Sequence, residues 1–299
     1  MRAARMHADE VEHDVPLVRR LVATQFPRWA DLPVEPFDSS GTDNAIYRLG
    51  DDMAVRLPRR AGSAAQVEKD LRWLPRLAPL LPVPVPVPLG AGRPAGGYPL
   101  PWSVHRWLDG ETPVAGRLTE PGPLAEDLAA FVAAFRGIGL PDGPPAYRGG
   151  PLAALDAPTR TALDDLRGTI DTGAATAAWE AALGAPGWTG PPVWVHSDLM
   201  PGNLLLVGGR LGAVIDFGTA GVGDPACDLI VAWNLLPAGA RDDFRAALRV
   251  DDATWARGRG RALSIALIAL PYYRDTNPAF AANARHVIRE VLADHENAT

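Results

Sequence analysis

The stretch of sequence that decides the fold is VHSDLMPGNLLLVGGRLGAVIDFG, residues 195–218. It opens with a turn that contains Pro201 and Gly202, and an apolar strand follows. The chain then reverses at 208–210, and a second apolar strand returns. Two short apolar runs around a glycine turn predict a β-hairpin over 204–207 and 211–215.

The predicted hairpin is expected to bring Asn203 and Asp216 together. Pairing its strands about the middle of Gly209 and Arg210 sets Asn203 opposite Asp216, and residues opposed in such a ribbon lie about 4.5–5.5 Å apart at Cα. Two oxygen ligands, completed by waters and substrate phosphates, are the usual way of holding Mg²⁺. Asp198 lies upstream on the same turn and is left free to accept a proton from a hydroxyl. The residues therefore predict a metal site with a base beside it.

An Asp or Asn at the end of a strand often only caps a turn. Here, however, the patterns HxDxxxxN (196–203) and DFG (216–218) occur in order, separated by a hairpin that joins them. Together they form the signature of phosphoryl transfer. We therefore favour the functional interpretation of these residues.

On these motifs the sequence resembles the kinase-like fold and, within it, the aminoglycoside phosphotransferase family of small-molecule antibiotic kinases, with macrolide kinases among its relatives. VHSDLMPGN is similar to the HGDxxxxN loop of the family, IDFG to its metal-binding motif, and DPACDL (224–229) to the helix start that follows. The resemblance implies that Asp198 is the catalytic base or hydroxyl-orienting group and that Asn203 and Asp216 bind Mg²⁺. It also implies that His196 braces the loop, and Asp228 is expected to stabilise it.

Outward from this stretch, the pattern predicts an α+β protein with a two-lobed, protein-kinase-like fold. A hairpin over 45–49 and 53–57, a helix from Ser63 to about Leu77 and an aromatic strand at 102–108 indicate a small, β-rich nucleotide-binding lobe, residues 1–108. The remainder, residues 109–299, is expected to be a larger, mainly helical catalytic and substrate-binding lobe. Its apolar stripes fall at 124–138, 226–236, 241–250, 254–270 and 278–292.

The nucleotide is expected to be ATP or GTP. Protein kinases have a lysine on the third strand of the small lobe, and the matching residue here is Arg56, which stays charged and can fork onto phosphate oxygens. Glu68 is the candidate partner of Arg56, although an i,i+4 pair with Arg72 is the simpler alternative. The turn expected over the phosphates holds Ser40, Gly41 and Thr42, and an ordinary loop is equally consistent with it. The hinge expected to bond the base is Arg106, Trp107 and Leu108.

The acceptor is expected to be a small molecule with a hydroxyl group. The segment from Asp216 to Asp224 is too short to support a peptide, and Met200 takes the place of the catalytic-loop lysine of protein kinases. Acidic side chains near the acceptor would suit an aminosugar, whereas aromatic ones would suit an apolar macrocycle, and the sequence leaves this open. Besides Asp198, the candidate lining residues are Asp156, Asp164, Trp233, Tyr272, Tyr273, Asp275 and Glu290.

Composition excludes several other classes. The net charge of the chain is −6. Residues 101–299 carry a net charge of −7 and residues 1–100 a net charge of +1, which argues against a nucleic-acid partner. Lys69 is the only lysine and lies in QVEKDLR, so a Walker P-loop is excluded. Cys227 is the only cysteine, which excludes a disulfide framework. No apolar run approaches the ~18 residues of a membrane span, no secretory signal is evident, and no protein partner is indicated, so a cytoplasmic location is expected.

The sequence therefore predicts a phosphotransferase that moves the γ-phosphate of ATP or GTP to a hydroxyl of an aminoglycoside-like or other antibiotic, which would confer antibiotic resistance. One alternative is a metabolic kinase for a sugar, amino alcohol or amino acid. The other is a non-catalytic, nucleotide-binding pseudokinase. Arg56 and the lack of a GxGxxG loop before its strand support the pseudokinase, and the intact set of Asp198, Asn203 and Asp216 argues against it.

Overall fold

The computed structural model describes residues 10–38 and 43–298 of the 299-residue chain. It divides the chain into two compact units. The first unit comprises Met1–Gly110 together with Ala213–Gly218, and the second comprises Glu111–Gly212 and Thr219–Thr299. The segment that carries Asp216 is thus grouped with the first unit, although the residues on both sides of it belong to the second.

The first unit is built on a five-stranded antiparallel sheet with the strand order β1-β2-β3-β5-β4. The strands are β1 (Val34–Phe37), β2 (Asn44–Leu49), β3 (Met53–Pro58), β4 (Pro88–Gly92) and β5 (Trp102–Arg106). β2 and β3 form the predicted hairpin, which turns at Gly50 with a φ of +61°. β4 lies at the edge of the sheet, where Pro88 has no neighbouring strand to which it must donate on its outer side.

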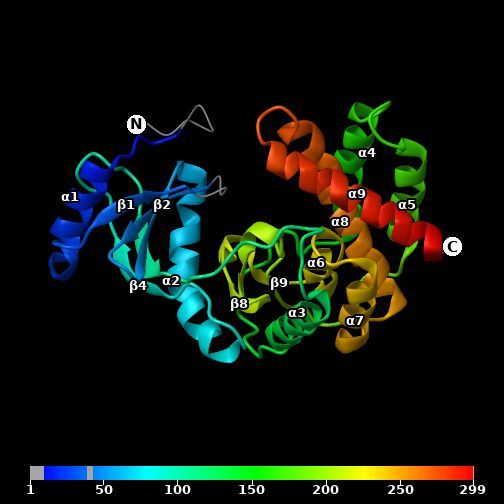
Figure 1. Ribbon diagram of the computed structural model, residues 1–299, viewed down its shortest axis with the longest axis horizontal. Helices are drawn as coiled ribbons and strands as arrows, with labels where there is room; N and C mark the ends of the chain where they lie inside the picture. The colour runs from blue at the N-terminus through cyan, green and yellow to red at the C-terminus, as the bar shows by residue number, and fades with distance from the viewer. Residues whose placement is uncertain (1–9, 39–42, 299) are drawn as a thin grey trace. The chain divides into compact units, whose positions relative to one another are not determined.

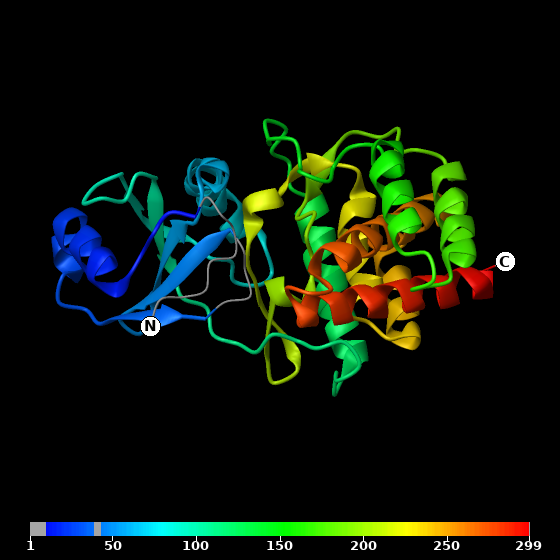
Figure 2. The same cartoon turned by 90° about the horizontal axis from the view of Figure 1, so that it is seen from above.

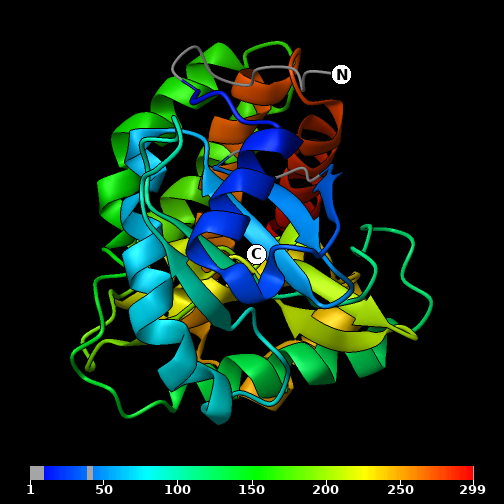
Figure 3. The ribbon, with the colours of Figure 1, turned by 90° about the vertical axis from the view of Figure 1, so that its left-hand side faces the viewer.

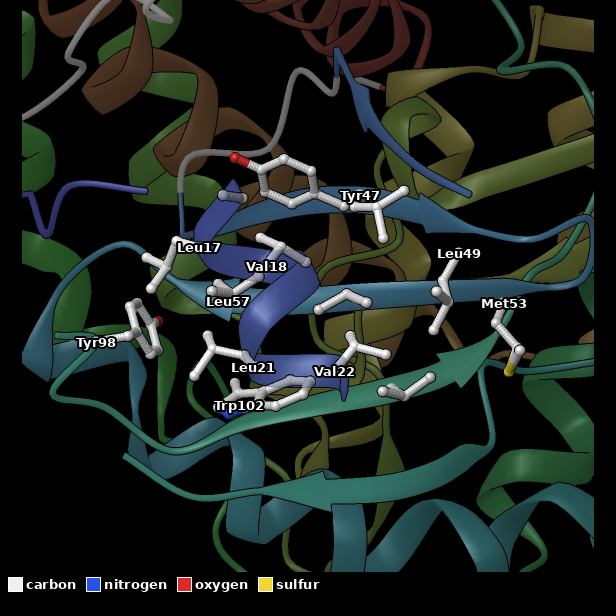
Figure 4. Packing of buried hydrophobic residues seen from close by; sticks show 14 residues of the cluster. Leu17, Val18, Leu21, Val22, Tyr47, Leu49, Met53, Leu57, Tyr98 and Trp102 are labelled. Atoms are coloured by element: carbon white, nitrogen blue, oxygen red, sulfur yellow. The ribbon is translucent and has the colours of Figure 1, made fainter. Parts of the chain in front are cut away.

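Helix α1 (Val15–Gln25) covers one face of this sheet (Figure 3). Its N-cap is Asp14, whose side chain accepts a hydrogen bond from the backbone N–H of Leu17 at 2.8 Å. Figure 4 shows the helix residues packed over apolar side chains of β2, β3 and β5. The buried residues labelled there are Leu17, Val18, Leu21, Val22, Tyr47, Leu49, Met53, Leu57, Tyr98 and Trp102. Each large apolar side chain so buried contributes roughly 1.5–3 kcal/mol, so this cluster dominates the stability of the sheet.

Helix α2 (Ala65–Leu77) faces the other side of the sheet. Side chains alternate along a strand, so Val55 and Leu57 of β3 face α1, whereas Arg56 between them points the other way. On that side Arg56 meets Asp70 of α2. The sheet therefore separates an apolar core from a face that carries charged residues.

The second unit is mainly helical (Figure 1). Its helices are α3 (Pro121–Arg136), α4 (Asp156–Asp165), α5 (Thr172–Gly184), α6 (Val231–Asn234), α7 (Ala238–Leu248), α8 (Asp252–Tyr273) and α9 (Pro278–Ala298). Helices α8 and α9 lie side by side, as Figure 2 also shows, and Arg259 of α8 is ion-paired with Asp294 of α9 at 3.1 Å. Over the described residues, no helix is both long and apolar enough to cross a membrane.

Four short strands complete the fold. β6 (Val193–Val195) pairs antiparallel with β9 (Gly221–Gly223), and β7 (Leu204–Val207) pairs with β8 (Arg210–Val214). The β6–β9 ladder pairs Val195 with Gly221, so the residues that follow Val195 lie next to those that precede Gly221, and Ser197 Oγ donates to the carbonyl oxygen of Thr219 at 3.1 Å. The sequence motif at 195–218 therefore lies on and between these short strands.

The β7–β8 hairpin forms, but its centre differs from the prediction. Gly208 and Gly209 take φ values of +58° and +80°, as both central residues of a two-residue type I′ turn must. The expected centre, one residue later, is wrong. Asp216 lies two residues beyond the end of β8.

Candidate active site

The loop after β6 is held by one buried carboxylate. The backbone N–H groups of His196 and Ser197 donate to Asp228 Oδ2 and Oδ1 at 2.9 and 2.7 Å. Ser197 has a φ of +62°, a left-handed conformation that is strained for a residue with a Cβ. The side chain of His196 is fully buried, so its place is beneath the loop. Asp228 thus holds the backbone of this loop with two hydrogen bonds, and the bracing role of the His196 side chain stays a prediction.

Asp228 belongs to a 3₁₀ turn, Pro225–Ile230, which Asp224 caps by accepting from the N–H of Ala226 at 2.9 Å. Burial raises the pKa of Asp228, while the neighbouring His196 and the two backbone donors oppose the rise. Asp224 behaves in the opposite way. Burial alone would raise its pKa, but hydrogen bonds from Arg257 and from the Ala226 N–H, and the charge of Arg261, hold it below the ordinary value.

Asp198 presents a carboxylate with both oxygens engaged. Oδ1 accepts from Arg148 Nη1 at 2.8 Å, and Oδ2 accepts from Asn203 Nδ2 at 3.0 Å. The side chain is 23% exposed, so a solute can reach it. Each carboxylate oxygen has two lone-pair directions, so these contacts fix the orientation of the carboxylate and leave room for a hydroxyl donor.

Asn203 ends the short 3₁₀ turn Pro201–Asn203. Its amide nitrogen Nδ2 donates two hydrogen bonds to Asp198, to the backbone carbonyl oxygen at 2.8 Å and to Oδ2 at 3.0 Å. The side-chain oxygen Oδ1 of Asn203 is an atom of the kind that Mg²⁺ takes as a ligand. Among the described residues, no group of three or more His, Cys, Asp or Glu side chains is placed to hold a metal ion. One amide oxygen and one carboxylate nevertheless fit Mg²⁺, which usually keeps several waters and binds phosphates.

Asp216 is the expected second ligand. It has a φ of +62°, and its side chain is 43% exposed. Arg56 Nη2 approaches Asp216 Oδ1 at 3.5 Å, and Arg56 Nη1 donates to Asp70 Oδ2 at 3.1 Å. The expected partner of Arg56, Glu68, is therefore wrong: Glu68 lies on the exposed side of α2, and the carboxylate that meets Arg56 is Asp70.

The surroundings of Arg56 are buried and polar. Burial raises the pKa of Asp70 to about 6, an effect that the Arg56 cation opposes and the Asp216 charge reinforces. Burial, and then the Arg56 charge, lower the pKa of His105 to about 3, so its imidazole is neutral. His105 Nε2 is 2.8 Å from Ser103 Oγ, and Ser103 lies opposite Arg56 in the sheet. The Arg56 guanidinium is thus held in one position by its ion pair with Asp70.

The IDFG motif is tied to α2 by the only lysine of the chain. Lys69 Nζ donates to the carbonyl oxygen of Gly218 at 2.9 Å, and burial lowers the pKa of this amine. An added Cβ at Gly218 would lie 2.8 Å from the side chain of Gln66, so the motif packs closely on the helix. These contacts fix the residues next to Asp216.

The expected nucleotide-binding residues are only partly described. Ser40, Gly41 and Thr42 lie outside the described residues. At the expected hinge, the N–H of Arg106 donates to Val87 and the N–H of Trp107 donates to Asp52, at 2.9 and 2.7 Å. The Trp107 ring packs against Phe37 at a centroid distance of 5.0 Å. Of the hinge N–H groups, that of Leu108 is the one without such a bond to a described backbone oxygen.

The acceptor candidates divide into core and surface residues. Trp233 is fully buried and packs against Trp255 at a centroid distance of 4.6 Å, so the expectation that it lines a binding site is wrong. Tyr272 is 63% exposed and contacts Tyr273 edge to face at 4.7 Å. Tyr273 in turn stacks near Phe280. The aromatic candidates on α8 therefore remain accessible only at its C-terminal end.

Each acidic candidate is paired with an arginine. The pairs are Asp156 with Arg160, Asp164 with Arg167, Asp275 with Arg274, and Glu290 with Arg241. A carboxylate that already has a guanidinium partner offers less attraction to a cationic ligand. The set of acids considered from the sequence is therefore not an open anionic site.

Sequence reasoning missed two residues near the motifs, Asp70 and Arg148. Asp70 could have been recognised from the sequence. It falls with Val67, Leu74 and Leu77 on the buried face of α2, where an acidic side chain requires a partner. Arg148 lies in a loop between α3 and α4, and no periodicity or spacing relates it to Asp198. Only the three-dimensional structure shows that Arg148 lies beside Asp198.

A two-unit chain with this sheet, these helices and a loop that presents Asp198 and Asn203 defines the class of the kinase-like phosphotransferases. A family model described as the phosphotransferase enzyme family matches residues 34–263. The chain belongs to this family, as the sequence resemblance implied, and it is a small-molecule kinase with a hydroxyl acceptor. No curated protein matches the sequence.

Solved structures have the same fold. The GDP and kanamycin complex of APH(2″)-IIIa superposes with a TM-score of 0.72 at 19% identity, covering 93% of this chain and 98% of that one. ADP-bound aminoglycoside phosphotransferase APH(2″)-Ib gives 0.59 at 15% identity, covering 93% and 98%. Macrolide 2′-phosphotransferase MphH from Brachybacterium faecium gives 0.61 at 22% identity, covering 92% and 98%. The predicted α+β, kinase-like fold is confirmed.

Proposed function

We propose that the protein transfers the γ-phosphate of ATP or GTP to a hydroxyl group of a small molecule in the cytoplasm. One observation carries the proposal: the Asp198 carboxylate is held from two sides, by Arg148 and Asn203, on a loop that buried Asp228 braces. Phosphoryl transfer needs little covalent help from the protein, and positioning of the reactants supplies most of the rate. A fixed, accessible carboxylate suits that task.

In this proposal Asp198 accepts the hydrogen bond of the acceptor hydroxyl and aims the hydroxyl oxygen at the γ-phosphorus. It takes the hydroxyl proton as the new P–O bond forms, while the bond from the γ-phosphorus to the β–γ bridging oxygen breaks and ADP or GDP leaves. Asn203, through its amide oxygen, and Asp216, through its carboxylate, would hold Mg²⁺. The ion would neutralise charge on the phosphate oxygens. Arg56, fixed by Asp70, binds phosphate oxygens with its planar guanidinium. These roles extend the family assignment to individual residues.

For the nucleotide, we propose that backbone groups of Arg106, Trp107 and Leu108 bond the base and that Ser40, Gly41 and Thr42 cover the phosphates. The N–H of Leu108, which meets no backbone oxygen of a described residue, and the carbonyl oxygens of this segment supply both hydrogen-bonding types. The related structures bound to GDP and to ADP support a nucleoside phosphate as the ligand. Either ATP or GTP satisfies this arrangement.

For the acceptor, the second unit favours an apolar body over a polycation. A narrow recess with a cavity volume of about 10 Å³ lies beside Met200, two residues after Asp198. Its lining is uncharged: Met200, Asn234, Ile265, Ala266, Ala269, Phe280, Asn283, Ala284 and Val287. The recess is no larger than about one water molecule, so it holds no part of an acceptor, and the choice rests on the acidic candidates Glu290 and Asp275, which are paired with arginines. We therefore propose a hydroxylated antibiotic of the macrolide kind as acceptor, with resistance as the biological role.

The test is nucleotide consumption with a panel of macrolides and aminoglycosides, for the wild type and for Asp198→Ala. We expect consumption to depend on a macrolide, and the variant to lose about 10²- to 10⁴-fold in kcat with nucleotide affinity retained. Asp243→Ala, an exposed acid on α7, is the matched control. Near-normal turnover by Asp198→Ala would remove this residue from the mechanism. Turnover with aminoglycosides alone would refute the proposed acceptor class.

A further inference from the structure

We propose that Arg148 is a positioning residue that orients the Asp198 carboxylate for phosphoryl transfer. The inference rests on the proposed function, because it concerns the group that meets the acceptor hydroxyl. It adds a residue that lies far from the sequence motif. It also explains how this chain works with a methionine, Met200, where protein kinases have a catalytic-loop lysine.

The contact is short and double. Arg148 Nη1 donates to Asp198 Oδ1 at 2.8 Å and to the carbonyl oxygen of Ser197 at 3.1 Å. A guanidinium is always charged, and its hydrogen bonds to a carboxylate are about twice as strong as neutral ones. One nitrogen thereby holds both the side chain of Asp198 and the strained residue before it. The carboxylate cannot turn without losing this bond.

The arginine itself is held by the buried part of the second unit. Its backbone carbonyl oxygen accepts from Arg261 Nη1 at 2.6 Å and from Cys227 Sγ at 3.0 Å. Arg261 is 2% exposed, donates also to the carbonyl oxygen of Gly150 at 2.5 Å, and is ion-paired with Asp224 at 3.3 Å. The N–H of Tyr147 donates to Thr219 at 3.0 Å. The loop that carries Arg148 is thus fixed on both sides.

Met200 cannot supply this interaction. A thioether has no hydrogen to donate and no charge, and here Met200 Sδ accepts from Asn234 Nδ2 at 3.1 Å. The positive group next to Asp198 comes from the loop before α4 instead. The Arg148 guanidinium also lies 5.4 Å from the centroid of the exposed Tyr147 ring, and this contact restricts the other orientations that the arginine side chain can take.

The assignment predicts a specific kinetic effect. Without Arg148, Asp198 keeps only the Asn203 bond and samples orientations that do not meet the hydroxyl. Because a hydrogen bond to a charged group is worth about one to two powers of ten in an equilibrium, kcat should fall about 10- to 100-fold. The KM for the nucleotide should stay within about twofold, since Arg148 makes no contact that binding of the nucleotide requires in this scheme.

The experiment compares Arg148→Gln and Arg148→Lys, each alone and combined with Asp198→Asn. The control is Arg160→Gln, which removes a surface ion pair with Asp156. The assay follows inorganic phosphate released from Mg·ATP and Mg·GTP with water as acceptor, and transfer to any acceptor found active. We expect the loss in kcat for Arg148→Gln, partial recovery in Arg148→Lys, and no further loss when Arg148→Gln is added to Asp198→Asn.

An unchanged kcat in Arg148→Gln, or the same loss with and without Asp198, would overturn the inference, because a purely structural arginine acts independently of its neighbour. A second readout is independent of turnover. Crystals of Arg148→Gln should show Asp198 turned away from its wild-type orientation, and an unmoved carboxylate would overturn the inference. A wild-type protein inactive with every acceptor would contradict the proposed function, and the crystals would then decide on Arg148 alone.

Discussion

Asp228→Ala should both destabilise the protein and disable the catalytic loop. The substitution removes the acceptor of two buried N–H groups, those of His196 and Ser197. A buried donor left without a partner costs about 1–3 kcal/mol, so the pair gives about 2–6 kcal/mol. In addition, Ser197 would be freed to leave its left-handed conformation, which is strained by about 1–3 kcal/mol. We therefore expect the loop to relax and Asp198 to lose its position.

The assay is equilibrium unfolding in urea together with phosphate release from Mg·ATP and Mg·GTP. Asp228→Asn keeps one oxygen acceptor and should fall between the wild type and Asp228→Ala in stability. Asp243→Ala, on the exposed side of α7, should lie within about 0.5 kcal/mol of the wild type. A free energy of unfolding for Asp228→Ala within 1 kcal/mol of the wild type, with activity retained, would refute the reasoning, and the two N–H groups would then need another acceptor.

Three further predictions concern the metal, the pH and the sheet. Asp216→Asn should weaken Mg²⁺-dependent nucleotide binding in titration calorimetry, and superimposable titrations of variant and wild type would contradict its role as a ligand. The pKa of Asp224 is held low, so its ionised form stabilises the fold above its unfolded pKa of about 3.9, and this stability is lost as the pH falls through the lower folded value. Asp224→Asn should therefore reduce the loss of unfolding free energy that occurs as the pH falls. The variant should also be less stable than the wild type at pH 7, because Arg257 and Arg261 lose a buried partner. An unchanged dependence of stability on acidic pH would argue against this pairing. Gly92→Ala should cost about 1–3 kcal/mol of unfolding free energy, because its Cβ would lie 2.0 Å from the buried Trp102 indole, whereas Gly62→Ala meets nothing within 4 Å and should be neutral; equal effects of the two would contradict the packing.

Much of the fold was predictable because its signals are local. Apolar periodicity located the helices of the second unit, and the two hairpins followed from short apolar runs around glycine turns. The register of the β7–β8 hairpin was not predictable from the letters alone, because it depends on which two residues adopt positive φ. The glycines at 208 and 209 do so, and this moves the centre by one residue.

The site was predictable where motif residues carry the chemistry and not where the fold supplies partners. Spacing predicted that one turn carries Asp198 and Asn203, and their hydrogen bond agrees with that placement, whereas their catalytic and metal-binding roles stay predictions. The partner of Arg56 was misassigned, because the choice between Glu68 and Asp70 depends on which side of α2 faces the sheet. Trp233 was misassigned for a related reason: an aromatic residue in a helix gives no sign of whether it faces a ligand or the core.

The single lysine of the chain allows one side chain to be labelled selectively. Lys69 carries the only side-chain amine of the chain, and its Nζ is bound to the last residue of the DFG motif. Burial lowers its pKa, which increases the unprotonated, nucleophilic fraction at moderately alkaline pH. An amine-directed fluorophore would therefore attach at one internal position, immediately beside the segment that carries Asp216, and its emission would report directly on events at that motif.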